Sequence, residues 1–378
     1  MGVTEAYREG RDLVVERPAV WLLVLATLYL AVDLAGKLAG VTLTVGGTQL
    51  VGGDLAVSTF GRFMKDGLIV GLVVGLAGVG LSMTYSILNF ANFAHGDYLT
   101  TGAFSGWLAA YVTAFVTLNA NVPFGEIFLL NEPALVSIVS TPLAVVVGVV
   151  VSAVVTIGSV LLLDRIVYRP MRDKGGISLL IASLGVALAL RYVIVIVFST
   201  NTRGLTRTSG VPALDIPAID GVVPLDAHEV TLVLFAVGLM LGVHLLLQRT
   251  KLGKAMRAMA DNKDLAQVTG IPTERVVRAT WIIGGGLAGV AGFLIVLERG
   301  TLNFNLGFRL LLLIFAGVIL GGIGSVYGAM GGGIIIGVVS RLSLVWIPSD
   351  FARVAAFLVM IVVLLYRPEG LFGGVTTA

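Results

Sequence analysis

Ten apolar segments, each close to the length of a membrane crossing, recur along the whole chain. A transmembrane helix needs about 20 apolar residues to cross the hydrocarbon core of a bilayer. Charged residues make up only 12% of the chain, whereas a soluble domain is about one quarter charged. We therefore predict an all-α integral membrane protein with about ten transmembrane helices, at Ala19–Leu38, Asp66–Leu88, Asp97–Val116, Pro142–Leu163, Ile177–Ser199, Val230–Gln248, Ala279–Leu297, Leu310–Tyr327, Ala329–Trp346 and Phe351–Tyr366.

The distribution of Lys and Arg predicts the orientation of these helices. Cytoplasmic loops of membrane proteins carry the excess of positive charge. If the N-terminus is cytoplasmic, 15 Lys and Arg residues fall in inner segments and 6 in outer ones. We therefore expect a multi-pass protein with both termini in the cytoplasm.

The first apolar segment is weaker than the others, because Asp33 and Lys37 interrupt it. A cleaved signal peptide is the alternative interpretation. The leader before Ala19 contains acidic residues, which favours a retained helix. We predict two parts: an N-terminal extension over residues 1–65, with one extra transmembrane helix and an outer loop, and a main domain over residues 66–373.

Polar residues crowd into the sequence NFANFAHGD, residues 89–97, between two apolar spans. Polar groups at membrane depth are tolerated where they face protein or a wet cavity. One interpretation is a broken or re-entrant element that lines a solute path. The other is a helix cap, in which Gly96 breaks one helix and Asn92 or Asp97 begins the next. The residues that we assign to a candidate path are Asn89, Asn92, His95, Gly96 and Asp97.

The polar segment over residues 249–278 is basic at both ends and contains a short helix of its own. Asp261 or Asn262 can cap this helix, and Gly270 followed by Ile271–Pro272 ends it. Its apolar side is rich in Ala and lacks the large apolar residues that are usual in a helix on the bilayer surface. A groove on another protein is therefore favoured as its partner. The candidate contact residues are Asp261, Asp264, Leu265, Ala266, Val268 and Gly270.

A glycine-rich run over residues 317–337 contains four pairs of glycines spaced four residues apart, and similar pairs occur at Gly71/Gly75 and Gly285/Gly289. Such spacing lets helix backbones pack closely. The sequence GGIGS differs, because three glycines in four residues make a poor continuous helix. We predict a break there that exposes backbone N–H groups to a solute carboxylate, formed by Gly321, Gly322, Gly324 and Ser325.

Isolated charges within or near the spans have structural interpretations. For Arg191, packing or extension toward the outer surface is favoured over contact with a solute. Glu298, Arg299 and Arg309 lie near an outer boundary. Headgroup contacts are the default for these three, with a soluble delivery protein as the alternative.

Several chemical signatures are absent from the sequence. Gly36–Lys37 and Gly253–Lys254 lack the upstream glycine of a GxxxxGK[ST] phosphate loop. The chain has no Cys, and its three His residues do not form a metal-ligand pattern. An enzyme is therefore disfavoured, and no cofactor or metal is expected.

Five stretches in order resemble one family. SMTYSILNFANFAHGDYLTTGAF (82–104), YRPMR (168–172), the loop over residues 253–275, VILGGIGSVYGAMGGGIIIGV (318–338) and RPEGLFG (367–373) are similar to Liv-type permeases. These permeases are the membrane subunits of importers for branched-chain amino acids, and ATP-binding cassette subunits drive the import. By order and loop length the resemblance is to the H-type subunit, and residues 66–373 form the permease domain.

The resemblance implies the importer-permease fold and a set of partners. These are a second, M-type permease subunit, two cytoplasmic ATPase subunits that use the ATP, an extracytoplasmic binding protein, a small amino-acid substrate and the lipid bilayer, with no nucleic acid. It implies the plasma membrane of a prokaryote, and it matches residues 261–270 to the segment that couples to the ATPase. The extension over residues 1–65 departs from the family pattern.

Two other functions stay open at this point. Relatives in the same family carry urea or short amides. A self-contained secondary transporter or channel, with His95 and Asp97 carrying protons, is a second possibility, and transport by the chain alone would distinguish it.

Overall fold

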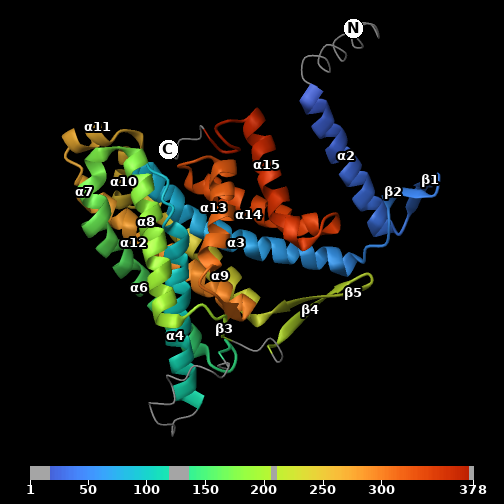
Figure 1. Ribbon diagram of the computed structural model, residues 1–378, viewed down its shortest axis with the longest axis horizontal. Helices are drawn as coiled ribbons and strands as arrows, with labels where there is room; N and C mark the ends of the chain where they lie inside the picture. The colour runs from blue at the N-terminus through green and yellow to red at the C-terminus, as the bar shows by residue number, and fades with distance from the viewer. Residues whose placement is uncertain (1–17, 119–135, 206–210, 374–378) are drawn as a thin grey trace. The chain divides into compact units, whose positions relative to one another are not determined.

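The structure is a computed structural model that describes residues 18–118, 136–205 and 211–373 (Figure 1). It confirms the predicted fold class, because a helix lies at each of the ten apolar segments. Nine helices in the described part of the chain are long and apolar enough to cross a membrane, and a tenth, α13, has 16 residues. The ten are α2 (Pro18–Ala39), α3 (Val57–Leu88), α4 (His95–Leu118), α6 (Pro142–Leu163), α8 (Gly176–Phe198), α9 (Ala227–Arg249), α12 (Thr273–Arg299), α13 (Leu306–Gly321), α14 (Val326–Leu342) and α15 (Ala352–Tyr366).

Short elements connect these helices. After α6 the chain continues as a helix through η1 (Asp164–Tyr168), α7 (Arg169–Met171) and η2 (Arg172–Lys174). Two polar helices, α10 (Lys251–Asp261) and α11 (Lys263–Val268), follow α9, and η3 (Ser343–Val345) and η4 (Ser349–Phe351) lie between α14 and α15. Three two-stranded sheets pair β1 (Thr42–Val45) with β2 (Thr48–Gly52), β3 (Arg203–Gly204) with β6 (Thr301–Leu302), and β4 (Ala213–Ala218) with β5 (Gly221–Asp226).

The chain divides into two compact units. In the described residues, the smaller unit contains 18–62 and 216–223. Here Asp33 is buried, accepts a hydrogen bond from the Gly52 backbone at 2.8 Å and lies 2.7 Å from the Lys37 ammonium. The two charges that interrupt the first apolar segment therefore neutralise each other and hold the β1–β2 hairpin. Retention of α2 and the boundary at residue 65 stay predictions.

Helix α3 begins nine residues before its predicted start at Asp66. The carboxylate of Asp220 accepts hydrogen bonds from the backbone N–H groups of Val57 and Ser58, which have no partner within the helix. These bonds hold the pKa of the exposed Asp220 carboxyl below its usual value. A sequence-distant residue thus caps α3, and no local signal at residue 57 predicts this.

The larger unit, over residues 63–215 and 224–373, is built around α12. This helix packs against both α4 and α6, and 83% of its apolar window is buried. Large aromatic side chains fill the space between these helices, because their burial gains the most apolar contact. The fully buried ones include Tyr98, Phe104, Trp107, Trp281 and Phe293.

The glycine pairs confirm the predicted close packing. A methyl group added at Gly333 of α14 would lie 2.4 Å from the Gly75 Cα atom of α3, and one added at Gly337 would lie 2.3 Å from that of Gly71. The pair Gly71/Gly75 of α3 therefore faces the pair Gly333/Gly337 of α14, and the two backbones are too close for a side chain to fit between them.

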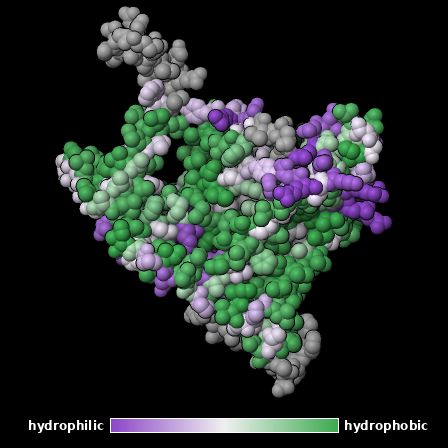
Figure 2. Space-filling view, turned by 180° about the vertical axis from the view of Figure 1, so that it is seen from behind, coloured by the Kyte–Doolittle hydropathy of each residue, from purple (hydrophilic) through white to green (hydrophobic). Residues whose placement is uncertain are grey.

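The outer helices leave large apolar side chains exposed, as expected for a lipid-facing surface. Figure 2 shows hydrophobic side chains over most of the visible face, with hydrophilic ones gathered near α10 and α11. Only 22% of the apolar window of α8, 33% of that of α9 and 6% of that of α15 is buried inside the protein. The molecule is therefore a multi-pass membrane protein.

Candidate functional site

The NFANFAHGD segment connects α3 to α4 through a non-helical stretch. Helix α3 ends at Leu88, and Asn89 adopts a left-handed backbone with φ 55°. Asn92 forms a turn that leads into α4, which begins at His95: its side-chain oxygen accepts from the Ala94 N–H at 3.1 Å, and its carbonyl accepts from the His95 N–H at 3.2 Å. The Asn92 side chain thus orders the entry to α4, and the interpretation of this segment as part of a solute path stays a prediction.

Gly96 does not break a helix, as the cap interpretation required, because it lies within the first turn of α4. A methyl group added there would lie 2.7 Å from the Gly307 carbonyl oxygen of α13. A glycine is needed at residue 96 for this close approach, whereas the break between the helices comes earlier, at Asn89.

His95 is held inside the protein. Its Nε2 donates to the Ala77 carbonyl oxygen of α3 at 2.8 Å, and its side chain is buried. This contact fixes the beginning of α4 against the middle of α3. The imidazole therefore positions two helices.

Asp97 forms an ion pair with Arg191 of α8. The guanidinium donates from Nε at 3.1 Å and from Nη2 at 2.9 Å to the two carboxylate oxygens, and the Asp97 side chain has no exposed surface. Arg191 also lies over the ring of Phe308, 4.6 Å from its centroid. The pair thus joins α4, α8 and α13.

This pair decides between interpretations of the sequence. Arg191 is packed inside the protein, which was one of the two favoured interpretations, whereas Asp97 binds Arg191 and does not cap α4. The sequence did contain a signal for the pair, because the spans of Asp97 and Arg191 each carry one charge with no local partner, and such charges tend to pair. The two residues are 94 positions apart, so the sequence does not show that they are partners.

The GGIGS sequence forms the predicted break, as a turn between α13 and α14. Gly322 and Gly324 adopt positive φ of 110° and 87°, which L side chains rarely adopt. The Ser325 hydroxyl caps α14 by accepting from the Gly328 N–H at 3.0 Å. The C-terminal segment closes the other side, because the N–H groups of Leu371 and Phe372 donate to the last carbonyls of α13, those of Leu320 and Gly321.

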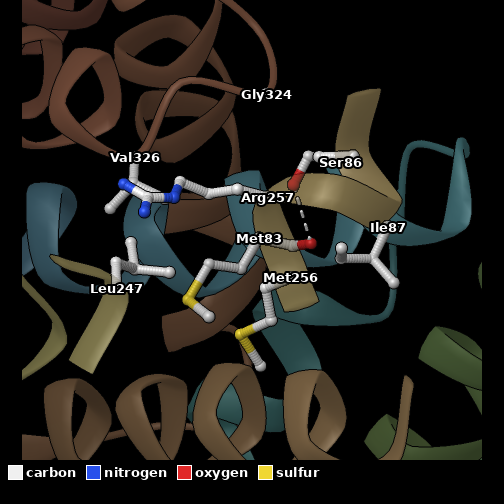
Figure 3. A pocket seen from close by; sticks show the side chains of 9 residues that line it. Met83, Ser86, Ile87, Leu247, Met256, Arg257, Gly324 and Val326 are labelled. Atoms are coloured by element: carbon white, nitrogen blue, oxygen red, sulfur yellow. Dashed lines mark hydrogen bonds between the residues drawn. The ribbon is translucent and has the colours of Figure 1, made fainter. Parts of the chain in front are cut away.

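The turn lies beside the end of α3 and beside α10. A small cavity at this point is lined by Met83 and Ser86 of α3, Leu247 of α9, Met256 and Arg257 of α10, and Gly324 with Val326 (Figure 3). A second cavity, of about 190 Å³, includes Asn89, Tyr168, Arg172 and Lys263 in its lining. Both halves of the predicted path therefore meet the α10–α11 segment, Asn89 through one cavity and Gly324 through the other.

Helix α11 exposes apolar side chains. Asn262 caps it by accepting from the Leu265 N–H at 2.9 Å, and Gly270, with φ 85°, follows its end. Ala266 is buried, whereas Leu265 is 61% and Val268 86% exposed. Asp264 lies in its first turn, and Asp261 ends α10. The predicted short helix exists, and two of its three apolar residues point away from the chain.

A chain of hydrogen bonds links α10 to the beginning of α14. Arg257 donates to the Gln248 side-chain oxygen at 3.1 Å, and the Gln248 amide donates to the Tyr327 hydroxyl at 3.0 Å. The same hydroxyl lies 2.8 Å from Nδ1 of His244. No pattern in the sequence predicts this connection, because its members belong to three different helices. Across the described residues, no cluster of three or more His, Asp or Glu is arranged to hold a metal ion.

Comparison with known proteins identifies related chains. A family model for the permease component of the branched-chain amino acid transport system matches residues 63–364. The high-affinity branched-chain amino acid transport system permease protein BraD of Pseudomonas aeruginosa is 28% identical over 311 residues, which cover 82% of this chain and 94% of the relative.

Two further relatives carry the name LivH. The high-affinity branched-chain amino acid transport system permease protein LivH of Escherichia coli strain K12 is 27% identical over 318 residues, covering 82% of this chain and 94% of the relative. The probable branched-chain amino acid transport permease protein LivH of Methanocaldococcus jannaschii is 30% identical over 324 residues. These residues cover 82% of this chain and 91% of the relative. The region that the family model matches begins after α2 and the β1–β2 hairpin.

Proposed function

Because this chain belongs to the family of branched-chain amino acid transport system permeases, we propose that it is the membrane-spanning subunit of an ATP-driven importer of branched-chain amino acids. The relatives are named for this transport. ATP hydrolysis belongs to separate subunits. The partners are a second permease subunit, two cytoplasmic ATPases and an extracytoplasmic binding protein.

One observation carries the coupling role, namely the exposed apolar side chains of α11. Leu265 and Val268 protrude from a short, capped helix at the end of the molecule that bears the basic loop. A helix of six residues has little stability by itself and depends on packing of its apolar side chains. Contact with a partner protein therefore explains why Leu265 and Val268 are exposed in this chain. We assign this end to the cytoplasm of a prokaryotic cell, as the distribution of positive charge predicts.

The mechanism follows from the contacts of α10 and α11. ATP binding by the partner subunits moves α11, and α10 moves with it because the two are joined at Asn262. Arg257 and Gln248 transmit the displacement to Tyr327 and hence to the α13–α14 turn. The energy comes from the different affinities of the ATPases for nucleotide in the two states of the pore.

The substrate path runs along the inner surface formed by Asn89 and the α13–α14 turn, which includes Gly321, Gly322, Gly324 and Ser325. Asn92 and Gly96 shape the entry to α4. His95 and Asp97 act indirectly, because Nε2 of His95 is bonded to Ala77 and the Asp97 carboxylate to Arg191. This arrangement disfavours a proton-carrying role for the two residues.

Charge introduced on α11 tests the coupling role. In the complete transporter reconstituted in liposomes, we expect L265D and V268D to reduce uptake of radiolabelled leucine at least about tenfold, because a carboxylate is costly in an apolar groove. Co-purification of the ATPases with the permease should weaken in parallel. Ile219→Asp is the matched control, since Ile219 is 92% exposed in the β4–β5 hairpin. Normal uptake by both α11 variants would rule out the coupling role.

A further inference from the structure

A basic cavity of about 230 Å³ lies among α12, α13, α14 and α15. Four arginines line it, one from each helix: Arg299, Arg309, Arg341 and Arg353. Helix α12 has 27 residues and is therefore about 40 Å long, so Arg299 lies at the end of the molecule opposite to α11. The proposed function assigns no role to this cavity.

The four guanidinium groups lack matching negative charge. No Asp or Glu is among the residues that line the cavity. Within the described parts of the chain, the only ion pair of the four is the one between Arg299 and Glu298, at 3.9 Å. Arg309 and Arg341 lie close enough to Arg299 to repel it. Since arginine stays charged in proteins, the cavity favours an anion.

We propose that this cavity binds the phosphate group of an anionic phospholipid. Guanidinium groups bind phosphate oxygens in pairs of parallel hydrogen bonds, and Asn303, Ser340 and Ser349 add further polar groups to the lining. A zwitterionic amino acid fits poorly, because its ammonium group would lie among the arginines. The site is thus distinct from the substrate path.

The lining of the cavity is amphipathic, as a lipid requires. Besides the polar groups, the lining includes the buried apolar side chains of Val70, Leu306, Leu310 and Leu313. The volume is several times the roughly 30 Å³ that a water molecule occupies, which is enough for a phosphate with part of its glycerol.

An apolar stripe on α15 favours a lipid over free phosphate. It begins one residue after Arg353 and consists of Val354, Leu358, Ile361 and Leu365, each more than half exposed. Spacings of three and four residues place them on one face of the helix. A phosphate at Arg353 therefore leaves its acyl chains a continuous apolar surface to follow.

Lipid titration of the purified full chain, followed by native mass spectrometry, tests the proposal. Phosphatidylglycerol and phosphatidylcholine with the same acyl chains are the probes, and inorganic phosphate is added in a separate arm. We expect wild-type protein to bind phosphatidylglycerol at least about tenfold more tightly than phosphatidylcholine, and millimolar phosphate not to displace it.

Variants locate the binding. Arg341→Gln combined with Arg353→Gln is expected to remove the preference for phosphatidylglycerol. Arg249→Gln combined with Arg278→Gln removes two exposed charges elsewhere and should preserve it. Arg341→Lys combined with Arg353→Lys keeps the charge and should retain part of the preference, which guards against misfolding of the Gln variant.

Three results would overturn the proposal. The first is equal binding of the two lipids by wild-type protein. The second is an equal loss of preference in the cavity variant and in the Arg249/Arg278 control. The third is displacement of the lipid by millimolar phosphate, which would assign the cavity to a soluble anion.

Discussion

Single side chains in this protein act mainly by joining helices that are far apart in sequence. The Asp97–Arg191 pair is the clearest case, because both groups lie in membrane-spanning helices and the carboxylate is fully buried. Water is not available there to stabilise either charge alone. The two residues therefore depend on each other for stability.

Removal of one partner of this pair should destabilise the protein more than removal of both. We expect Asp97→Asn to cost about 3 kcal/mol, because it leaves the guanidinium without its counter-charge. The double variant D97N/R191Q should recover much of that loss. Thermal unfolding of the purified chain in detergent measures both. A double variant as unstable as the sum of the single ones would show that the two residues are not coupled.

At the scale of helices, close packing and capping decide which element touches which. Gly71 and Gly75 of α3 face Gly337 and Gly333 of α14, whereas α8, α9 and α15 leave much of their surface exposed. Helices packed through glycine cannot separate slightly without losing contact along their length. The α3–α14 contact is thus a fixed part of the fold.

Gly333→Ala tests this contact. The added methyl group would lie 2.4 Å from the Gly75 Cα atom, so the helices must move apart, and overpacking of this kind typically costs about 1–3 kcal/mol. The control is Gly238→Ala in α9, where an added methyl group meets nothing within 4 Å. A lower melting temperature for G333A, with no decrease for G238A, is the expected result in detergent. Equal stability of the two would contradict it.

The cap supplied by Asp220 should make the beginning of α3 sensitive to acid. Because the folded state holds the pKa of this carboxyl below its usual value, its stabilising effect is present above the unfolded pKa of about 3.9 and is lost as the pH falls through the folded value. Hydrogen exchange, corrected for intrinsic rates, should show weaker protection of residues 57–61 in D220N at pH 7. Wild-type protein should approach D220N only in acid. Protection in D220N equal to wild-type at pH 7 would exclude the cap.

On the scale of the whole molecule, the spans were predictable because the length and apolar character of a segment are local properties. The break at GGIGS and the short helix after Asn262 were predictable for the same reason. The start of α3, the partner of Arg191 and the chain from Arg257 to Tyr327 were not, since each depends on a contact between residues far apart or in different helices. Family membership indicates the function, and the proposed route of coupling is built on the contacts.

Loss of the Tyr327 hydroxyl should impair transport more than stability. Tyr327→Phe removes the acceptor of Gln248 and the partner of His244, and one hydrogen bond of about 1 kcal/mol corresponds to roughly a fivefold change. We expect leucine uptake by the complete transporter to fall about fivefold while ATPase activity continues. Tyr192→Phe, at an exposed position on α8, is the control. Unchanged uptake in Y327F would exclude the hydrogen-bonded chain from coupling.

The contact between the C-terminal segment and the α13–α14 turn has a consequence for biogenesis. Residues 371 and 372 leave the ribosome after α13, α14 and α15, yet their backbone N–H groups satisfy the last carbonyls of α13. During synthesis these carbonyls gain their backbone partners only after α13, α14 and α15 have been made, so the turn is closed later than the helices that it joins. A stop codon directly after α15 would therefore leave α13, α14 and α15 in the protein but remove the two hydrogen bonds that close the turn between α13 and α14.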